Sequence, residues 1–352
     1  MKCEHSCQQK TADATIWKAI YMANRFFLAP VPCIVYEDGP HYIFDVDKTF
    51  PEKCMNRFKA AVLLLTTTFF WGVTFTIVKQ AVESIDVFVF LSQRFILAFV
   101  LILPICLFKG KHLDARTLRQ GCIMGIFLFG AYSFQTVALL YTSASNTGFL
   151  TGLNVVMVPV LSSLMLQHRI PGMIKIAVAL SAVGLFLLCG NGSLKFNTGD
   201  ILAATCAVCV SLHLIYTGEF VRTSDYYWLT AVQLGVVALL STLFAVARGK
   251  QVFIWYPHLL WTLLICAVIA TVFAFLVQTS MQRFISHSNT ALIFCTEPVF
   301  AAGYAWFAIN ERLGLFGLAG ALLILAGMVV SIMPETSGGE EVASLEEYRA
   351  GE

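Results

Sequence analysis

The sequence predicts an all-α integral membrane protein with ten transmembrane helices, arranged as two inverted five-helix repeats. Of its 352 residues, 58% are hydrophobic and 12% charged, and the mean hydropathy is +0.76. A soluble domain has roughly 45–50% apolar and about 25% charged residues. The apolar residues gather in blocks long enough to cross a ~30 Å hydrocarbon core as helices, which satisfy their backbone hydrogen bonds internally. Residues 145–190 also recur as 288–333.

The recurrence is an internal duplication with an offset of 143 residues. Each copy reads as helix, short basic turn and helix. The offset pairs Ser145 with Ser288, Val156 with Val299, Arg169 with Arg312 and Gly184 with Gly327. A duplicated apolar chain is typical of carriers whose two halves face each other across the bilayer.

Ten blocks of about 17–23 residues are predicted to span the membrane. The first repeat, residues 58–190, contains 58–78, 87–108, 119–140, 145–166 and 173–190. The second repeat, residues 191–333, contains 200–217, 228–247, 257–280, 288–308 and 315–333. The tight turns at 141–144 and 309–314 predict that the helices on either side are antiparallel neighbours. Small-residue pairs predict close helix packing, at Gly121/Gly125, Gly148/Gly152 and Gly320/Gly327.

The distribution of Lys and Arg predicts the orientation. With the N-terminus inside, the inner segments of the first half carry Lys53, Arg57, Lys59, Lys109, Lys111, Arg116, Arg119, Arg169 and Lys175, and the outer segments only Lys79. The Lys and Arg residues of the second half favour the opposite orientation more weakly. The inner segments carry Arg222 and Arg283, and the outer segments carry Lys195, Arg248, Lys250 and Arg312. The stronger first half predicts that both termini are cytoplasmic, in a bacterial-type cytoplasmic (inner) membrane. Because each half has five spans, an odd number, the second repeat is expected to enter the membrane in the opposite orientation to the first.

The two ends of the chain differ in composition from the predicted spans. Residues 1–57 hold scattered charges and short apolar runs, without the order of a cleavable signal peptide. We expect an N-terminal extension that is cytosolic, with residues 1–54 either a misassigned upstream start or a dispensable tail. Residues 334–352 are acidic, with six Glu and one Arg from position 335 onward, and are expected to form a solvated cytosolic tail.

Several short motifs together resemble the EamA-type family of the drug/metabolite transporter superfamily. They are Phe70-Trp71-Gly72-Val73-Thr74-Phe75, Arg94-Phe95, Tyr141 to Val160, Ser288-Asn289-Thr290 with Glu297-Pro298-Val299, and Asn310-Glu311-Arg312-Leu313. The resemblance covers residues 58–333. It implies a ten-helix, inverted-repeat carrier that moves amino acids or other small metabolites, usually outward.

Two charged residues lie deep inside predicted spans, away from the span ends, where each needs a partner or a wet cavity. Arg94 in the second span is a candidate for substrate contact, or else for a structural ion pair or a position at the cytosolic edge. Glu297 in the ninth span precedes Pro298, and its repeat mate is Asn154. It could bind a substrate ammonium group, carry a proton, or pair with Arg94. If both line one cavity, they complement a zwitterion such as an amino acid.

The remaining candidates are uncharged at neutral pH. His213 in the sixth span is a candidate for proton coupling or for a packed, hydrogen-bonded histidine. Other predicted lining residues are Trp71, Gln135, Asn154, Tyr216 and Gln278. Repeat symmetry places the neutral Gln233 near the position in the seventh span that is equivalent to that of Arg94, so the site is expected to be electrically asymmetric.

Composition and motifs also exclude partners. The net charge of +2 gives no sign of nucleic-acid binding, and the chain has no Gly-Lys-Ser/Thr phosphate loop for ATP. Cys206-x-x-Cys209 lacks a second pair for metal, so no cofactor is expected. The expected partners are a small metabolite, the lipid bilayer and, as a candidate coupling ion, protons; a homodimer stays open. The alternatives to a carrier are a membrane enzyme acting on lipid or lipid-linked substrates and a small-solute channel.

Overall fold

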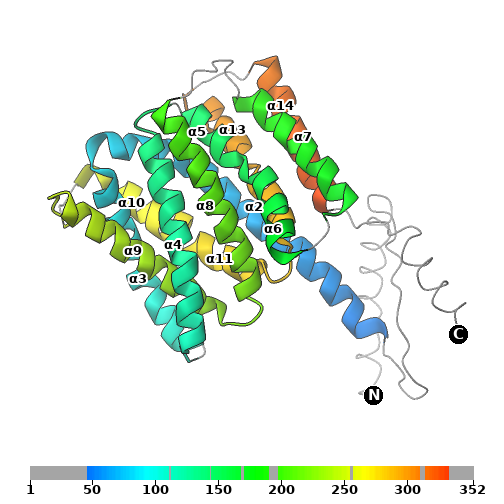
Figure 1. Ribbon diagram of the computed structural model, residues 1–352, viewed down its shortest axis with the longest axis horizontal. Coiled ribbons are helices and arrows are strands. Elements are labelled where there is room, and N and C mark those ends of the chain that lie inside the picture. Colours follow the sequence, from blue (N-terminus) through cyan, green and yellow to red (C-terminus); the bar gives the residue numbers. More distant parts are fainter. Residues whose placement is uncertain are drawn as a thin grey trace, which may run out of the picture. The chain divides into compact units, whose positions relative to one another are not determined.

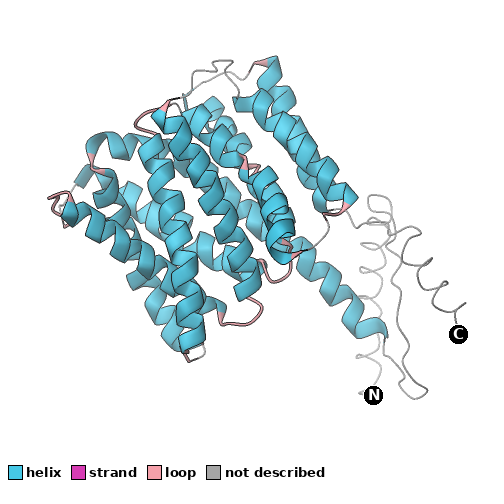
Figure 2. Cartoon of the chain, in the orientation of Figure 1, coloured by secondary structure: helices cyan, strands magenta, loops and turns pink. Residues whose placement is uncertain are grey.

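The described part of the chain is a bundle of helices. The computed structural model describes residues 46–110, 112–142, 144–167, 170–189, 197–253, 257–309 and 314–332, and within these ranges it contains no strand (Figure 2). The predicted acidic tail 334–352 lies outside the described residues. So does the predicted N-terminal extension, except for residues 46–57 at the start of the first helix.

The helices follow one another through short connections (Figure 1). In the first half they are α2 (Val46–Ser84), α3 (Val87–Lys109), α4 (Ala115–Ala138), α5 (Ala144–Gly152), α6 (Asn154–Leu166) and α7 (Gly172–Cys189). In the second half they are α8 (Thr198–Phe220), α9 (Tyr226–Ala247), η1 (Pro257–Leu259), α10 (Leu260–Ala267), η2 (Val268–Phe273), α11 (Ala274–Met281), α12 (His287–Phe294), α13 (Glu297–Ile309) and α14 (Leu315–Ile332).

Eight helical segments are long and apolar enough to cross a membrane. They are Phe58–Ser84, Val87–Lys109, Ala115–Ala138, Thr147–Leu166, Thr198–Phe220, Tyr226–Ala247, Leu260–Met281 and Leu315–Ile332. The predicted span 173–190 is a shorter apolar helix, Gly172–Leu188. The predicted span 288–308 is divided between α12 and α13. The described residues therefore give eight spans by length, and the full number of ten stays a prediction.

Acidic and amide side chains fix where several helices begin. Asp86 accepts hydrogen bonds from the backbone of Phe88 and Val89 at the start of α3, and Asp225 accepts one from Trp228 at the start of α9. Asn197 and Asp200 form a reciprocal capping box at the start of α8. Asp114 caps α4, and hydrogen bonds from Thr117 hold the pKa of its carboxyl below the usual range. These caps satisfy amides that a helix start leaves open.

The duplication in the sequence is repeated in the helix boundaries. With the same offset of 143, α5 begins at Ala144 and α12 at His287, while α6 runs from Asn154 to Leu166 and α13 from Glu297 to Ile309. The helices α7 and α14 match over their whole lengths by the same offset. Each half therefore contains one helix that is interrupted at the corresponding place, after Gly152 in the first and after Phe294 in the second.

Equivalent helices of the two halves pack against each other in antiparallel directions. Phe88 at the start of α3 stacks on Phe244 near the end of α9 at 5.3 Å between ring centroids, and Cys106 near the end of α3 contacts Tyr227 at the start of α9. In the pair α7 and α14, which lie side by side in Figure 1, Gly184 meets Gly320 whereas Ser181 meets Gly327. Antiparallel mates are what inverted repeats require.

The predicted glycine seams are largely present. A Cβ atom on Gly121 or Gly125 would lie 2.6 Å from a Cβ atom of α9, at Val232 or Val236 respectively. Gly320 approaches the backbone of α7 to 2.5 Å, measured from an ideal Cβ position. Gly148 is different, because no atom lies within 4 Å of its Cβ position. The predicted seam at Gly148 and Gly152 is therefore wrong for Gly148, which faces open space on α5.

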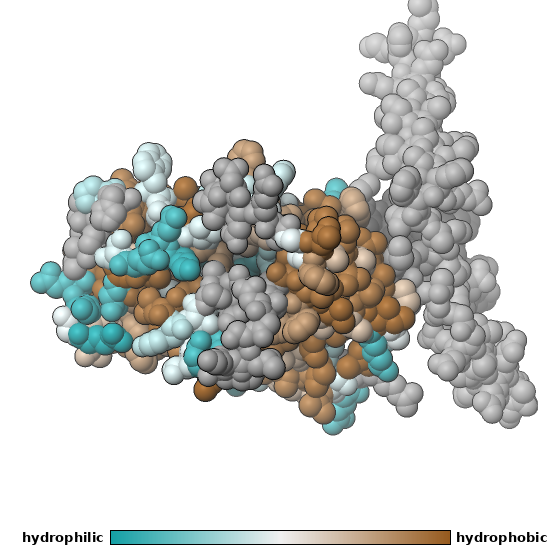
Figure 3. Space-filling view, turned by 90° about the horizontal axis from the view of Figure 1, so that it is seen from above, coloured by the Kyte–Doolittle hydropathy of each residue, from teal (hydrophilic) through white to brown (hydrophobic). Residues whose placement is uncertain are grey.

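Many large apolar side chains are exposed on the described helices, and on the face shown in Figure 3 the apolar residues gather toward one side. Among the most exposed are Phe108, Trp261, Phe307, Leu315 and Phe316. A soluble monomer rarely exposes contiguous apolar patches of this kind, whereas lipid chains cover them without cost. The exposed faces and the long apolar helices together define a multi-pass integral membrane protein.

Candidate functional site

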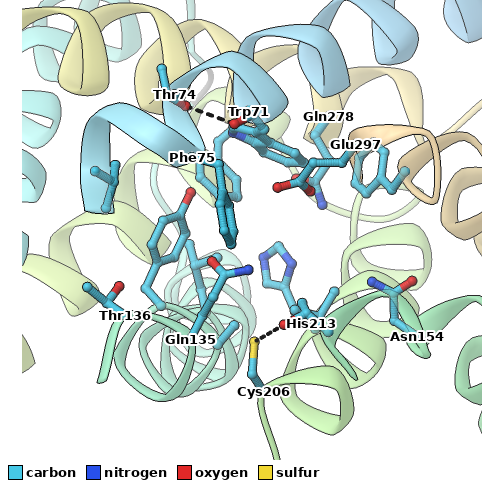
Figure 4. A pocket seen from close by; sticks show the side chains of 18 of the residues that line it. Trp71, Thr74, Phe75, Gln135, Thr136, Asn154, Cys206, His213, Gln278 and Glu297 are labelled. Carbon is cyan, nitrogen blue, oxygen red and sulfur yellow. Dashed lines mark hydrogen bonds between the residues drawn. The ribbon is translucent and has the colours of Figure 1, made fainter. Parts of the chain in front are cut away.

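The two halves together line a partly open cavity of about 100 Å³ (Figure 4). Its lining comes from α2, α3, α4, α5 and α6 of the first half and from α8, α11, α12 and α13 of the second. A buried water needs roughly 10–15 Å³, so the cavity has room for several waters. It is smaller than the roughly 300–1,000 Å³ of drug-sized pockets, which restricts this state to a small solute.

Seven of the eight residues predicted to form the site line this cavity: Trp71, Arg94, Gln135, Asn154, His213, Gln278 and Glu297. Tyr216 does not line it. Its ring stacks on Phe127 and Phe220 at 5.4 and 5.3 Å between centroids. On α8 it lies about 60° from His213 and about 80° from Cys206 around the helix axis, since each residue advances a helix by about 100°.

Arg94 is buried and held by three acceptors. Its Nε donates to Thr271 Oγ1 at 2.8 Å, and its Nη2 donates to the carbonyl of Ala270 at 3.2 Å and to Tyr132 Oη at 3.4 Å. The guanidinium also lies 4.9 Å from the centroid of the Tyr132 ring, within the range of a cation–π interaction. Arg94 thus joins α3 to α4 and to the middle of the eighth predicted span.

The residues of the eighth predicted span that accept hydrogen bonds from Arg94 belong to a short π-helix, η2. Thr271 Oγ1 donates to the carbonyl of Cys266 at 2.7 Å, and the carbonyl of Ala270 accepts from both Arg94 and Trp71 Nε1, the latter at 2.9 Å. A π-bulge frees carbonyls from the α-helical ladder and is frequent at functional sites. Thr271 and Ala270 were not predicted, because no Pro or Gly marks this segment.

Glu297 is the first residue of α13 and projects toward the cavity beside Gln278 (Figure 4). Pro298 follows it and lacks the amide that would continue a helix from α12. The helix can approach α2 here because Gly72 has no side chain: a Cβ on Gly72 would lie 2.8 Å from the Glu297 carbonyl. Across the described ranges, no ion pair joins Glu297 to Arg94. That predicted structural pairing is absent from this conformation.

Amide side chains complete the polar part of the lining. His213 Nε2 lies 2.7 Å from Gln233 Oε1, and Gln233 Nε2 donates to Thr279 Oγ1 at 3.2 Å. Gln278 Nε2 donates to Gln282 Oε1 at 3.3 Å. The Oδ1 of Asn154 and the Oε1 of Gln278 are buried and have no hydrogen-bond partner among the described residues. Gln233, the repeat mate of Arg94, is thus engaged by His213 outside the lining.

Several lining residues were missed from sequence, including Thr74, Phe75, Tyr132, Thr136, Thr151 and Cys206. Tyr132 lies three residues before Gln135 on α4, so helical spacing could have indicated it. Thr151 donates to Cys206 Sγ at 3.9 Å, a contact between α5 and α8 that spacing cannot indicate. Cys209 packs against Gly130 instead of facing the cavity. No group of three or more His, Cys, Asp or Glu residues in the described ranges is placed to hold a metal ion.

A multi-pass helical membrane protein with a small cavity between two duplicated halves, lined by both polar and apolar side chains, has the architecture of a solute transporter. The chain belongs to the EamA-like transporter family, whose sequence pattern matches residues 58–190 and 197–333. The family is therefore the one that the sequence motifs resembled.

Relatives agree with this assignment, and a solved structure shares the fold. An uncharacterized transporter of Archaeoglobus fulgidus is 33% identical over 276 residues, which are 78% of this chain and 86% of that protein. The uncharacterized transporter YyaM of Bacillus subtilis is 25% identical over 297 residues, covering 79% of this chain and 94% of its own. A crystal structure superposes with a TM-score of 0.64 at 19% identity, over 77% of this chain and 96% of that one. This last likeness concerns the fold alone.

Proposed function

We propose that the protein is a facilitative or secondary active transporter that exports small, amino-acid-like metabolites by alternating access between its two halves. The observation that carries the proposal is a cavity to which one half contributes Arg94 and the other contributes Glu297. A guanidinium and a carboxylate that do not pair with each other can each receive the opposite charge of a zwitterion.

The free groups of these two residues support this assignment. No hydrogen bond of Arg94 Nη1 and none of the Glu297 carboxylate is found with the described residues, although both side chains line the cavity. A substrate carboxylate can therefore reach the outer nitrogen of Arg94 without displacing Thr271. The aromatic rings of Trp71, Phe75 and Phe275 supply the apolar remainder of the lining.

Alternating access needs parts that can move against each other around the cavity. The interrupted helices support such movement, because α5/α6 and α12/α13 each break at the level of the cavity, beside Asn154 and Glu297. Thr296 stabilises the second break by donating its hydroxyl to the carbonyl of Ile293 at 2.6 Å. The π-helix η2 gives a third irregular segment against the cavity wall.

The proposed location is a prokaryotic cytoplasmic membrane with both termini inside. The excess of Lys and Arg on the predicted inner segments of the first half supports this orientation. The curated relatives come from an archaeon and a bacterium, which agrees with that kind of membrane.

Export is tested by profiling the metabolites in the medium of cells that produce the protein, the Arg94→Ala variant at equal membrane level, or neither. We expect at least one amino-acid-like metabolite to accumulate only with the unmutated protein. Counterflow in proteoliposomes then separates the carrier from a channel, since only a carrier shows accelerated exchange when the solute is present on both sides. A medium identical to that of cells without the protein would contradict export.

A further inference from the structure

We infer that Glu297, Asn154 and Gln278 form an ammonium subsite, so that a positively charged amino group is the feature that the cavity requires of its substrate. The inference rests on the proposed transport function and deepens it, because it names which of the two charges of a zwitterion is selected. A carboxylate on the substrate is then tolerated but not required.

The first observation is an excess of hydrogen-bond acceptors. Asn154 is 7% exposed and Gln278 is 1% exposed, yet Asn154 Oδ1 and Gln278 Oε1 have no partner among the described residues. The Glu297 carboxylate, which lines the same cavity, has no bonded donor there either. Buried acceptors without donors are rare in folded proteins and call for an explanation such as a ligand. An ammonium group carries three donors and no acceptor, which matches this set.

The orientation of Gln278 follows from its neighbours. Its Nε2 donates to Gln282 Oε1 at 3.3 Å, and Gln282 Nε2 donates in turn to the carbonyl of Leu214 at 3.0 Å. Because the carbonyl of Leu214 can only accept, Gln282 must present its oxygen to Gln278. Gln278 must therefore present its nitrogen to Gln282, which leaves its oxygen without a donor.

Apart from Arg94 Nη1, the strong donors of the lining are already engaged elsewhere. Two nitrogens of Arg94 donate to Thr271, Ala270 and Tyr132, and Trp71 Nε1 donates to the same carbonyl of Ala270. Arg94 is thus mainly occupied in fixing the π-helix, and the acceptors at Glu297 and Gln278 depend on the ligand. The rings of Trp71 and Phe294 also line the cavity and favour a cation over an anion.

Glu297 supplies the carboxylate of the cavity lining, and the duplication relates its position to that of Asn154. Asn154 and Glu297 are repeat mates, each the first residue of the helix that follows the break. Their two side chains approach the cavity from opposite halves, and only one of them is charged. The polarity of the subsite is therefore set by Glu297 alone, and its substitution by Gln leaves two neutral amides where a carboxylate and an amide stood.

The test measures how matched probes change the thermal unfolding of the purified full-length protein. Three sets share a side chain and differ in their charges: leucine, isoamylamine and isocaproate; alanine, ethylamine and propionate; phenylalanine, phenethylamine and hydrocinnamate. We expect the amino acid and the amine of at least one set to raise the Tm at millimolar concentration, and the acid of that set to have no effect. In Glu297→Gln the apparent affinity for the amine should fall by about tenfold or more.

The matched control is Glu83→Gln, the same chemical change on an exposed position of α2 outside the cavity. It should respond to every probe as the unmutated protein does. The inference is overturned if no amine raises the Tm, if the acids do so as well as the amines, or if Glu297→Gln binds amines unchanged. Should Glu297→Gln fail to fold, the comparison of probes on the unmutated protein still decides.

Counterflow in vesicles separates this inference from the transport function. Exchange of a solute that lacks an amino group, equal in the unmutated protein and in Glu297→Gln, would keep the transporter and remove the ammonium subsite. Amine-dependent stabilisation without exchange of any probe would keep the subsite and remove the transport function.

Discussion

Arg94 carries a permanent positive charge within a membrane-spanning helix, and its hydrogen bonds explain how the fold accommodates it. An unpaired charge at this depth is costly, and each buried guanidinium nitrogen without an acceptor adds to the cost. Thr271, Ala270 and Tyr132 provide acceptors from two different helices. A lysine could not replace this arrangement, because its ammonium is a single point and cannot bridge acceptors that the planar guanidinium spans.

Thr271 offers the cleanest test of this role, because its hydroxyl touches Arg94 and its removal leaves the charge in place. Thr271→Val, which keeps the shape of the side chain, should lower the free energy of unfolding by about 1–3 kcal/mol, since it leaves Arg94 Nε buried without an acceptor. Thr271→Ser retains the hydroxyl and should lose much less. The measurement is reversible unfolding in mixed micelles, and equal stability of the Val and Ser variants would contradict a stabilising hydrogen bond between Thr271 and Arg94.

At the scale of the helix, hydropathy was sufficient to predict most of the elements. Eight of the ten predicted spans coincide with long apolar helices, and α3 and α9 start directly after Asp86 and Asp225. The π-helix η2 was not predictable from local sequence. Its irregular carbonyls are satisfied by Trp71 and Arg94, nearly two hundred residues away, so the signal lies in tertiary contacts.

The candidate site was likewise predictable from the sequence only in part. Charged and amide residues inside apolar blocks stand out in the sequence, and this signal found Arg94, Asn154 and Glu297. Aromatic and hydroxyl residues such as Tyr132 and Thr151 do not stand out, because they are common in membrane helices and only their helix face decides whether they line a cavity. Tyr216 shows the same difficulty, since neighbouring residues on α8 line the cavity and it does not.

The packing of α7 against α14 gives a prediction at this scale. An ideal Cβ on Gly184 would lie 2.6 Å from the carbonyl oxygen of Gly320 and 2.8 Å from the backbone nitrogen of Ile324. Neither backbone atom can move without shifting the helix, so Gly184→Ala should lower the free energy of unfolding by about 1–3 kcal/mol.

The matched control is Gly303→Ala within α13, where no atom lies within 4 Å of the Cβ position. Alanine should be neutral or stabilising there, because it favours a helix by about 1 kcal/mol over glycine. Thermal unfolding of the two variants in the same detergent compares them. A Gly184→Ala protein as stable as Gly303→Ala would show that the helices are not in close contact.

For the whole molecule, contacts between connections indicate which of them share a side of the membrane. Asp86 lies 3.7 Å from Arg248, and Thr142 donates to Asp200 at 2.8 Å. All four residues flank spans on the side predicted to be outer. Gln120 accepts from Ser224 at 2.5 Å and Glu219 contacts His287 at 3.2 Å, and these four flank the predicted inner side. The contacts thus agree with the sidedness that ten crossings require.

The contacts define two sides but not which of them is cytoplasmic, and here the charge asymmetry of the first half makes the prediction. Arg116 and Lys250 are both exposed and lie on opposite predicted sides, after the second and the seventh spans. In intact cells, a membrane-impermeant maleimide should label Lys250→Cys above the background of the unmutated protein, and should label Arg116→Cys only after the cells are broken. The reverse pattern would mean that the weaker, opposite charge bias of the second half determines insertion. Equal labelling of both positions in intact cells would contradict the odd number of crossings between them, and with it the inverted relation of the two halves.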